Sequence, residues 1–193
     1  MSSSQPEQST PAAKKPLSSR AKILKAASEL VAEYGPAAMS LEAVAARAGL
    51  SKGGLLYNFS NKAKLLEAIV EEHLAEFKTR LDHEAAERAA SPNALCTAFL
   101  LLTRCDESVK KGPPAGMLAA LAENPDFLEP VRRFNRELFE RLKTTSRDPE
   151  LALITVLAIE GLRLSQLIGT EILTEAEKTD VLKRLELMLD GSA

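Results

Sequence analysis

A short basic and glycine-rich stretch, GLSKGG at residues 49–54, contains the residue types of this chain with the most potential for chemistry. Glycines leave backbone N–H groups accessible, and a lysine beside them can hold a phosphate. A nucleotide-binding loop needs the pattern G-x-x-x-x-G-K-[ST], or G-x-G-x-x-G after a strand. GLSKGG matches neither pattern. The stretch therefore indicates either a tight turn or a phosphate contact of another kind.

The other reactive residues are too few and too scattered to suggest catalysis. Cys96 and Cys105 are nine residues apart, and His73 and His83 are ten apart. On a helix, the members of each pair point in different directions. No nucleophile stands beside a base and an orienting third group. We expect no enzyme activity, no catalytic residue, no metal and no cofactor.

Charge is divided unevenly along the 193 residues. Residues 1–62 carry eight Lys or Arg and four Glu, whereas the remainder carries 17 basic and 23 acidic residues. A basic head on an acidic body indicates that the head meets a polyanion, although chance clustering is the alternative. No apolar run reaches transmembrane length, and the N-terminus lacks the apolar region of a secretory signal. We expect no membrane partner and a cytoplasmic location.

Apolar residues recur at helical spacing nearly throughout, and no strand-like alternation persists. This pattern predicts an all-α fold of about nine helices that follows a disordered tail at 1–18, rich in Ser, Pro and Gln. In the first half, start and stop signals place helix ends at Gly35–Pro36 and Gly49, and starts at Ser40, Ser51 and Asn61, the last helix running to about Arg88. In the second half, they predict helices from Ser91–Pro92 to about Val109, at 115–123, from Phe127 to Thr145, from Asp148–Pro149 to Gly169, and from a Thr174–Glu177 capping box to Gly191.

The two helices on either side of Gly49 are joined by a very short connection. Glycine adopts a positive φ without strain, which permits a steep crossing of the two helices. Ala45 is small enough for a close approach, and Leu50 and Leu55 can fill the junction. These features together are typical of a helix-turn-helix.

The residues 43–69, AVAARAGLSKGGLLYNFSNKAKLLEAI, resemble the DNA-binding signature of the TetR family of bacterial transcriptional regulators. That signature reads A-x-x-A-G-[VL], followed by S-K-G/x-T-L-Y-x-[HY]-F-x-[SN]-K-x-x-L. The resemblance covers about residues 19–69. It implies a three-helix DNA-binding domain at 19–66 and a larger helical domain for effector binding and dimerisation at 67–193.

The resemblance also implies that the third helix enters the major groove of operator DNA. The residues that it implies at the DNA are Ser51, Lys52, Gly53, Tyr57, Asn58 and Lys62. We also expect Gly54 and Leu56 of the same helix at the DNA, and Lys64, because nearby phosphates would explain a lysine in the first turn of a helix. Arg20 and Lys22, at the start of the first helix, add to the same basic field. Tyr57 could instead be a core aromatic, whereas for Phe59 a core position is the stronger prediction. Gly54 and Leu56 stand where the family often has Thr and Tyr. The base preferences of the family therefore cannot be transferred, although Leu56 could contact a thymine methyl group.

The segment 151–169 is apolar nearly all round, as expected for a helix that is buried on two sides. The family implies a homodimer formed by a four-helix bundle of the last two helices of each subunit. The residues predicted at this interface are Ala158, Gly161, Ser165, Leu182, Leu185 and Leu189. Alternatively, both helices complete the core of a single chain, and the residues by themselves leave both interpretations open.

An effector pocket is harder to locate from the residues. The predicted pocket residues are Phe99, Thr103, Met117, Phe134, Glu160 and Arg163. The alternative for Glu160 and Arg163 is an i, i+3 ion pair at the surface or at the dimer interface. The alternative for the other four is an ordinary core position.

The leading hypothesis is a ligand-responsive repressor, a homodimer that binds a near-palindromic operator and is released by an unknown small molecule. A second hypothesis is a constitutive DNA-binding protein without an effector. A third is an enzyme or carrier that retains the helix-turn-helix as a relic. Activation in place of repression depends on the position of the operator, which the sequence does not reveal.

Overall fold

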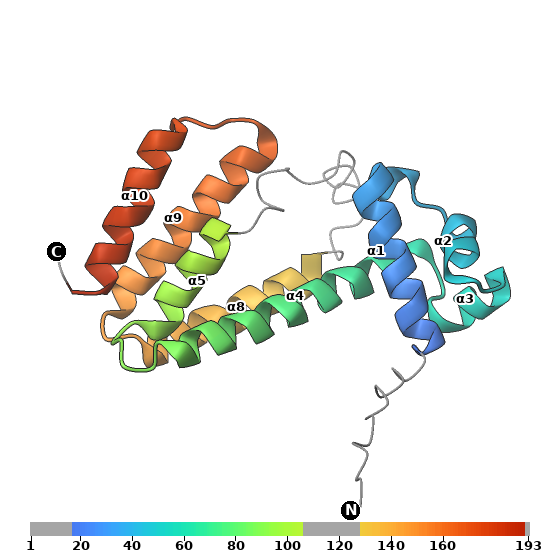
Figure 1. The fold of residues 1–193 in the computed structure, drawn as a ribbon, viewed down its shortest axis with the longest axis horizontal. Helices are drawn as coiled ribbons and strands as arrows, with labels where there is room; N and C mark the ends of the chain where they lie inside the picture. Colours follow the sequence, from blue (N-terminus) through green and yellow to red (C-terminus); the bar gives the residue numbers. More distant parts are fainter. Residues whose placement is uncertain (1–16, 106–127, 192–193) are drawn as a thin grey trace, which may run out of the picture.

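The computed structural model describes residues 17–105 and 128–191, and within these ranges the chain forms eight α-helices and no strand (Figure 1). The predicted all-α fold class is confirmed. The helices are α1 (Ser19–Ala38), α2 (Leu41–Ala48), α3 (Lys52–Asn58), α4 (Lys62–Glu87), α5 (Ala94–Cys105), α8 (Glu129–Thr145), α9 (Pro149–Ile168) and α10 (Glu175–Leu189). The predicted helix at 115–123 lies outside the described residues, and so does Met117.

The first three helices and the start of α4 form a small unit with its own core. Leu24, Val44, Leu55 and Leu65 come from these four helices and are all buried in it. The predicted caps are confirmed at three of the helix starts: the side chains of Ser40, Ser51 and Asn61 each accept a hydrogen bond from the backbone N–H three residues further on. Local hydrogen bonds therefore set where α2, α3 and α4 begin.

The second unit is built around the far part of α4. Helices α5, α8, α9 and α10 pack there around a core that includes Phe77, Phe99 and Leu142. The last buried residue of the first core is Ala68 and the first of the second core is Phe77. Helix α4 thus belongs to both units, and α8 lies alongside it (Figure 1).

The predicted helix end at Gly35–Pro36 is wrong, because α1 continues to Ala38. Proline in a helix interior usually bends or ends the helix, because it removes one N–H donor and crowds the carbonyl four residues earlier. Helix α1 nevertheless passes through Pro36 and continues for two further residues. The chain leaves the helix at Met39, which is extended and buried in the first core. Ser18, the last residue of the predicted tail, accepts the N–H of Ala21 with its hydroxyl and caps α1.

The predicted start of a helix at Ser91–Pro92 is wrong as well. Helix α5 begins at Ala94, and the carbonyl of Asn93 accepts its first hydrogen bond, from the N–H of Thr97. The buried side-chain amide of Asn93 donates to the carbonyl of Leu189 at the end of α10, at 2.8 Å. This tertiary contact moves the helix start away from the local proline signal.

Both ends of the last two helices follow the sequence signals closely. Gly169 has a φ of 69° and ends α9, and Thr174 with Glu177 forms the predicted capping box of α10. Helix α10 ends at Leu189, and Gly191 follows with a φ of 73°. Among the described helices, none combines the length and the apolar character needed to cross a lipid bilayer.

Candidate nucleic-acid interface

The turn between α2 and α3 depends on Gly49. Its φ of 69° is left-handed, and the N–H of Leu50 returns to the carbonyl of Ala45 at 2.9 Å. A Cβ at position 49 would meet no atom within 4 Å, so the backbone angle and not the space requires glycine there. The turn holds α3 against α2 through the buried side chains of Ala45 and Leu55. The helix-turn-helix expected from the residues is therefore present.

Helix α3 has one buried face and one exposed face. Leu55 and Phe59 are buried in the first core, whereas Tyr57 is 91% exposed and Leu56 is 38% exposed. Tyr57 is therefore no core aromatic, and the core position predicted for Phe59 is confirmed. A large aromatic side chain that stands almost entirely in solvent is available to contact another molecule.

Two glycines lie in the first turn of α3 without an internal reason for being glycine. A Cβ at Gly53 or Gly54 would meet only the Ser51 hydroxyl, at 3.9 Å and 3.4 Å. Neither residue has a positive φ. The Ser51 hydroxyl accepts the N–H of Gly54 at 3.1 Å, and the Asn58 amide donates to the Gly54 carbonyl at 2.9 Å. The polar groups of Ser51 and Asn58 therefore already bind within α3.

Several basic side chains of this unit are held by carboxylates. Lys52 pairs with Glu42 and Lys64 with Glu67, each at 2.6 Å. On the other side of α2, Arg47 makes two hydrogen bonds of 3.0 Å to Glu33. These contacts lower the pKa of Glu33 and of Glu42, because hydrogen bonds from Arg47 and Lys52 favour the ionised carboxylates.

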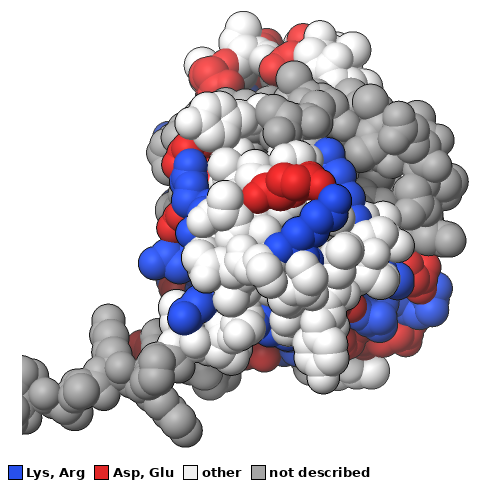
Figure 2. Space-filling view, turned by 90° about the vertical axis from the view of Figure 1, so that its right-hand side faces the viewer, with Lys and Arg blue, Asp and Glu red and all other residues white. Residues whose placement is uncertain are grey.

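The remaining predicted cations are placed differently. The Arg20 guanidinium lies 5.5 Å from the centroid of the Phe59 ring, a cation–π contact beside α3. Neither Lys22 nor Lys62 forms an ion pair with another residue in the described ranges. Figure 2 views the molecule from the end that carries α2 and α3. It shows basic side chains spread over a mostly uncharged face, with acidic atoms against them near its centre.

The carboxylates that pair with these basic side chains were not predicted from the sequence. The spacing of Lys64 and Glu67, three residues apart on one helix, is a signal that could have identified that pair. Glu42 and Lys52, like Glu33 and Arg47, belong to different helices. No local spacing identifies such pairs, because the crossing of the helices decides them.

The predicted effector residues that the structure describes differ in their surroundings. Phe99 is buried in the second core, edge-on to Phe77, and the Thr103 hydroxyl donates to the carbonyl of Phe99. Glu160 and Arg163 form an i, i+3 ion pair of 3.2 Å, with both side chains about 40% exposed. This agrees with the surface-pair alternative. Phe134 lines a groove.

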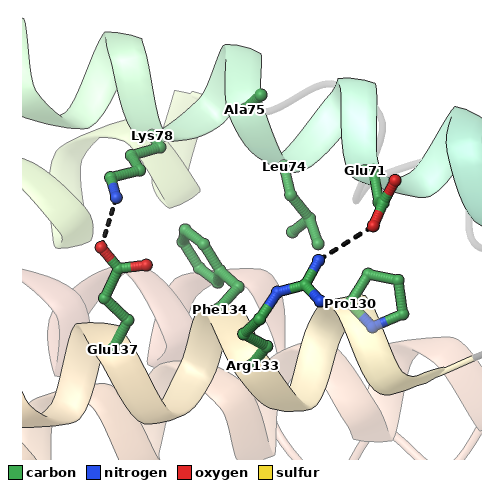
Figure 3. Close-up of a pocket in the computed structure, with 8 residues that line it drawn as sticks. All are labelled: Glu71, Leu74, Ala75, Lys78, Pro130, Arg133, Phe134 and Glu137. Atoms are coloured by element: carbon green, nitrogen blue, oxygen red, sulfur yellow. Dashed lines mark hydrogen bonds and ion pairs between the residues drawn. The ribbon is translucent and has the colours of Figure 1, made fainter.

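That groove lies between α4 and α8 and encloses about 160 Å³. Leu74 points from α4 toward α8 and Phe134 from α8 toward α4, between the ion pair of Glu71 with Arg133 and that of Lys78 with Glu137 (Figure 3). The lining residues are Glu71, Leu74, Ala75, Lys78, Pro130, Arg133, Phe134 and Glu137. The groove thus has an apolar floor between two neutralised charge pairs.

The predicted dimer residues divide into two groups. Leu182, Leu185 and Leu189 are buried in the core of this single chain, so the intrachain alternative applies to them and they offer no free surface. Their i, i+3 and i, i+4 spacing identified an apolar face of α10 but not what covers it. Gly161 is exposed, whereas Ala158 and Ser165 are half-buried. A stripe of apolar side chains runs past Gly161 on α9, each between 49% and 63% exposed: Ile154, Leu157, Leu164 and Ile168.

Two family models match the chain. One, described as bacterial regulatory proteins of the tetR family, matches residues 23–69, and the other, described as tetracyclin repressor-like C-terminal domain, matches residues 93–190. The chain therefore belongs to the tetR family of bacterial regulatory proteins, which are regulators and not enzymes.

The buried Cys96 fits a structural role, because burial raises the pKa of its thiol to about 12.

Among curated proteins, the chain is 36% identical over 124 residues to the HTH-type transcriptional repressor Rv3405c of Mycobacterium tuberculosis. The match covers 63% of this chain and spans only 64% of the length of that relative. An HTH-type transcriptional regulator of Mycobacterium bovis, Mb3439c, matches equally well.

Solved structures share the fold over most of the chain. A transcriptional regulator from Rhodococcus sp. Rha1 has a TM-score of 0.63 at 23% identity, covering 91% of this chain and 94% of its own. The multidrug binding protein EbrR, in complex with ethidium, has a TM-score of 0.62 at 25% identity, covering 87% and 98%.

Proposed function

We propose that this protein represses transcription by binding operator DNA through α3. The observation that carries the proposal is the exposed face of α3, where Tyr57 stands almost fully in solvent while Leu55 and Phe59 anchor the helix in the core. A short helix held rigidly by its buried side, with an aromatic side chain projecting outward, suits insertion into a major groove.

Seven of the eleven predicted DNA residues can be given a role that agrees with their position. Tyr57 and Leu56 are the side chains of α3 that can reach base edges, Leu56 through an apolar contact such as a thymine methyl group. Lys52 precedes these two residues in the chain, and Lys62 and Lys64 follow them. All three lysines are suited to contacts with DNA phosphates, which position a protein without reading the base sequence. The small Gly53 and Gly54 allow the backbone to approach the DNA closely.

A homodimer is the second part of the proposal. Helix α9 is buried on one side through Ala152, Val156 and Ile159, and exposes an apolar stripe with Leu157 and Leu164 on the opposite side. A chain that buries this stripe against a second copy removes apolar surface from water. A two-fold dimer would also present two copies of α3 to half-sites about one DNA turn apart, roughly 34–36 Å.

An effector that binds between α4 and α8 is the third part. Helix α4 carries side chains of both cores, so a ligand that displaces α8 from α4 would shift the DNA-binding unit. The relative EbrR was solved with ethidium, and Rv3405c is named a repressor, which supports a ligand-responsive repressor. The protein would act in the cytoplasm, where bacterial operator DNA lies.

A constitutive DNA-binding protein is the second candidate, and the size of the groove favours it. Ligand pockets for drug-sized molecules usually enclose about 300–1,000 Å³. The groove between α4 and α8 encloses about 160 Å³. A compound screen that finds no molecule able to release the bound DNA would support this candidate.

DNA binding is tested with the segment upstream of the protein's own coding region. We expect a sequence-specific mobility shift at moderate salt, competed by the same segment but not by random DNA. A protected near-palindrome in a footprint would then define the operator. Binding that random DNA competes equally well would overturn the proposal.

A further inference from the structure

The ion pair between Lys52 and Glu42 links α3 to α2. The lysine Nζ lies 2.6 Å from the carboxylate, and both side chains are exposed, at 59% and 62%. Neither is part of the core of this unit. An exposed pair of this kind contributes little to folding, so a reason for the acid should be sought at the surface.

The position of Glu42 is unusual for a surface that meets DNA. Lys52 is one of the cations available for a phosphate contact under the proposed function, and Glu42 already occupies it. A DNA phosphate that approaches Lys52 must displace a carboxylate of the same charge, or bind beside it against repulsion. The lowered pKa of Glu42, caused first by the hydrogen bond from Lys52, keeps this carboxylate ionised at neutral pH.

We propose that Glu42 sets the DNA affinity of this protein by competing with DNA phosphates for Lys52. The inference rests on the proposed function, since it requires that α3 binds DNA. Glu42 lowers affinity for operator and random DNA alike, because a phosphate contact carries no sequence information. A dimer with this internal competitor at both recognition helices dissociates more readily from non-specific DNA.

The test is Glu42→Gln, which keeps the side-chain size and removes the charge. We expect operator binding to become about threefold to tenfold tighter per half-site at low salt. Random DNA should gain by a similar factor. The dependence of log K on log salt should steepen by about one per subunit, as for one added phosphate contact.

Two further variants separate competition for Lys52 from a general charge effect. Glu140→Gln breaks an exposed 2.7 Å pair with Lys143 on α8 and removes the same charge far along the chain. We expect it to leave DNA affinity unchanged. In the Lys52→Gln background, Glu42→Gln should give little further gain, because the contested cation is absent.

Several outcomes would overturn the inference. Weaker DNA binding by Glu42→Gln would mean that Glu42 orients Lys52 for its contact with DNA. Unchanged binding would mean that breaking the ion pair between Lys52 and Glu42 costs no binding free energy. A full gain in the Lys52→Gln background would exclude competition for that lysine. Because the expected result is a gain in DNA affinity, partial unfolding of the variant cannot produce it. If wild-type protein binds no DNA, the proposed function fails instead, which is a distinguishable result.

Discussion

At the scale of single residues, two aromatic side chains two positions apart, one on α3 and one at its C-cap, have opposite environments. Tyr57 is 91% exposed, and Phe59 is 5% exposed and lies under the Arg20 guanidinium. Phe59 has no polar group to keep in water, so burying it stabilises the fold. Tyr57 has a hydroxyl and an apolar ring, the combination that suits a wet interface.

Tyr57→Ala should therefore separate DNA binding from stability. We expect operator affinity to fall by about 1–3 kcal/mol, the usual size of a base contact. The free energy of unfolding in urea should change by less than about 0.5 kcal/mol, because the side chain is exposed. Fluorescence anisotropy with labelled operator and a urea titration measure the two quantities. Tyr34→Ala on α1, which removes the other tyrosine of the chain and is also exposed, is the matched control.

Gly53→Ala should have opposite effects on folding and on DNA binding. The position is helical, and a Cβ there has room. Alanine should raise the free energy of unfolding by up to about 1 kcal/mol. If the backbone of α3 approaches DNA closely, the added methyl group should weaken operator binding at the same time. A variant that is more stable and binds DNA normally would show that Gly53 faces no DNA.

At the scale of elements, α4 and α8 are joined by a row of ion pairs. Glu71 pairs with Arg133, Lys78 with Glu137, and Asp82 with Arg141, and the partners rise together in number along both helices. The two helices therefore run parallel. Charges alternate along each helix, so a shift of one turn would set like charges opposite each other. The row thus fixes the register between the helix that reaches the DNA-binding unit and its neighbour.

The middle pair of this row should make stability depend on acid pH. The hydrogen bond from Lys78 lowers the pKa of Glu137, so its contribution is present above the ordinary carboxyl pKa near 4.5 and is lost as pH falls through the lower folded value. Glu137→Gln should therefore be less stable than wild type at pH 7, and the difference should shrink below about pH 4. Urea midpoints measured between pH 3 and pH 7 test this. Glu72→Gln, which removes another exposed carboxylate from α4, controls for net charge.

At the scale of the whole molecule, the exposed stripe of α9 is the surface through which we propose that the dimer forms. Leu157 and Leu164 are more than half exposed although the opposite side of the same helix is buried in the second core. A helix that is apolar on both sides is normally covered on both. In the proposed dimer the two recognition helices would bind together, so the second half-site would add affinity without any new contact.

Leu157→Asp should therefore produce a monomer that still folds. A charge in the centre of a buried interface is strongly unfavourable, whereas in the monomer this position faces water. We expect sedimentation to report half the mass, and operator affinity to fall by about a hundredfold or more. Leu17→Asp, an exposed leucine ahead of α1, should leave the mass unchanged. A Leu157→Asp protein that remains dimeric would place the interface elsewhere.

The amino-acid sequence by itself determined where most helices start and how α3 is presented. The caps at Ser40, Ser51 and Asn61, the turn at Gly49 and the capping box at Thr174 and Glu177 were all predicted. Each depends on hydrogen bonds or backbone angles within three or four residues, so the local sequence specifies it. The family signature at residues 43–69 contains three of these signals, at Gly49, Ser51 and Asn61.

Only the tertiary structure decided which partner each surface meets. Leu182 and Leu185 are core residues, whereas Leu157 is exposed, although all three lie on apolar helix faces. Periodicity shows that a face is apolar but not which neighbour covers it. The pairing of Glu42 with Lys52 likewise depends on how α2 and α3 cross. Contacts between helices are set by the angles and distances of packing, which no spacing within one helix contains.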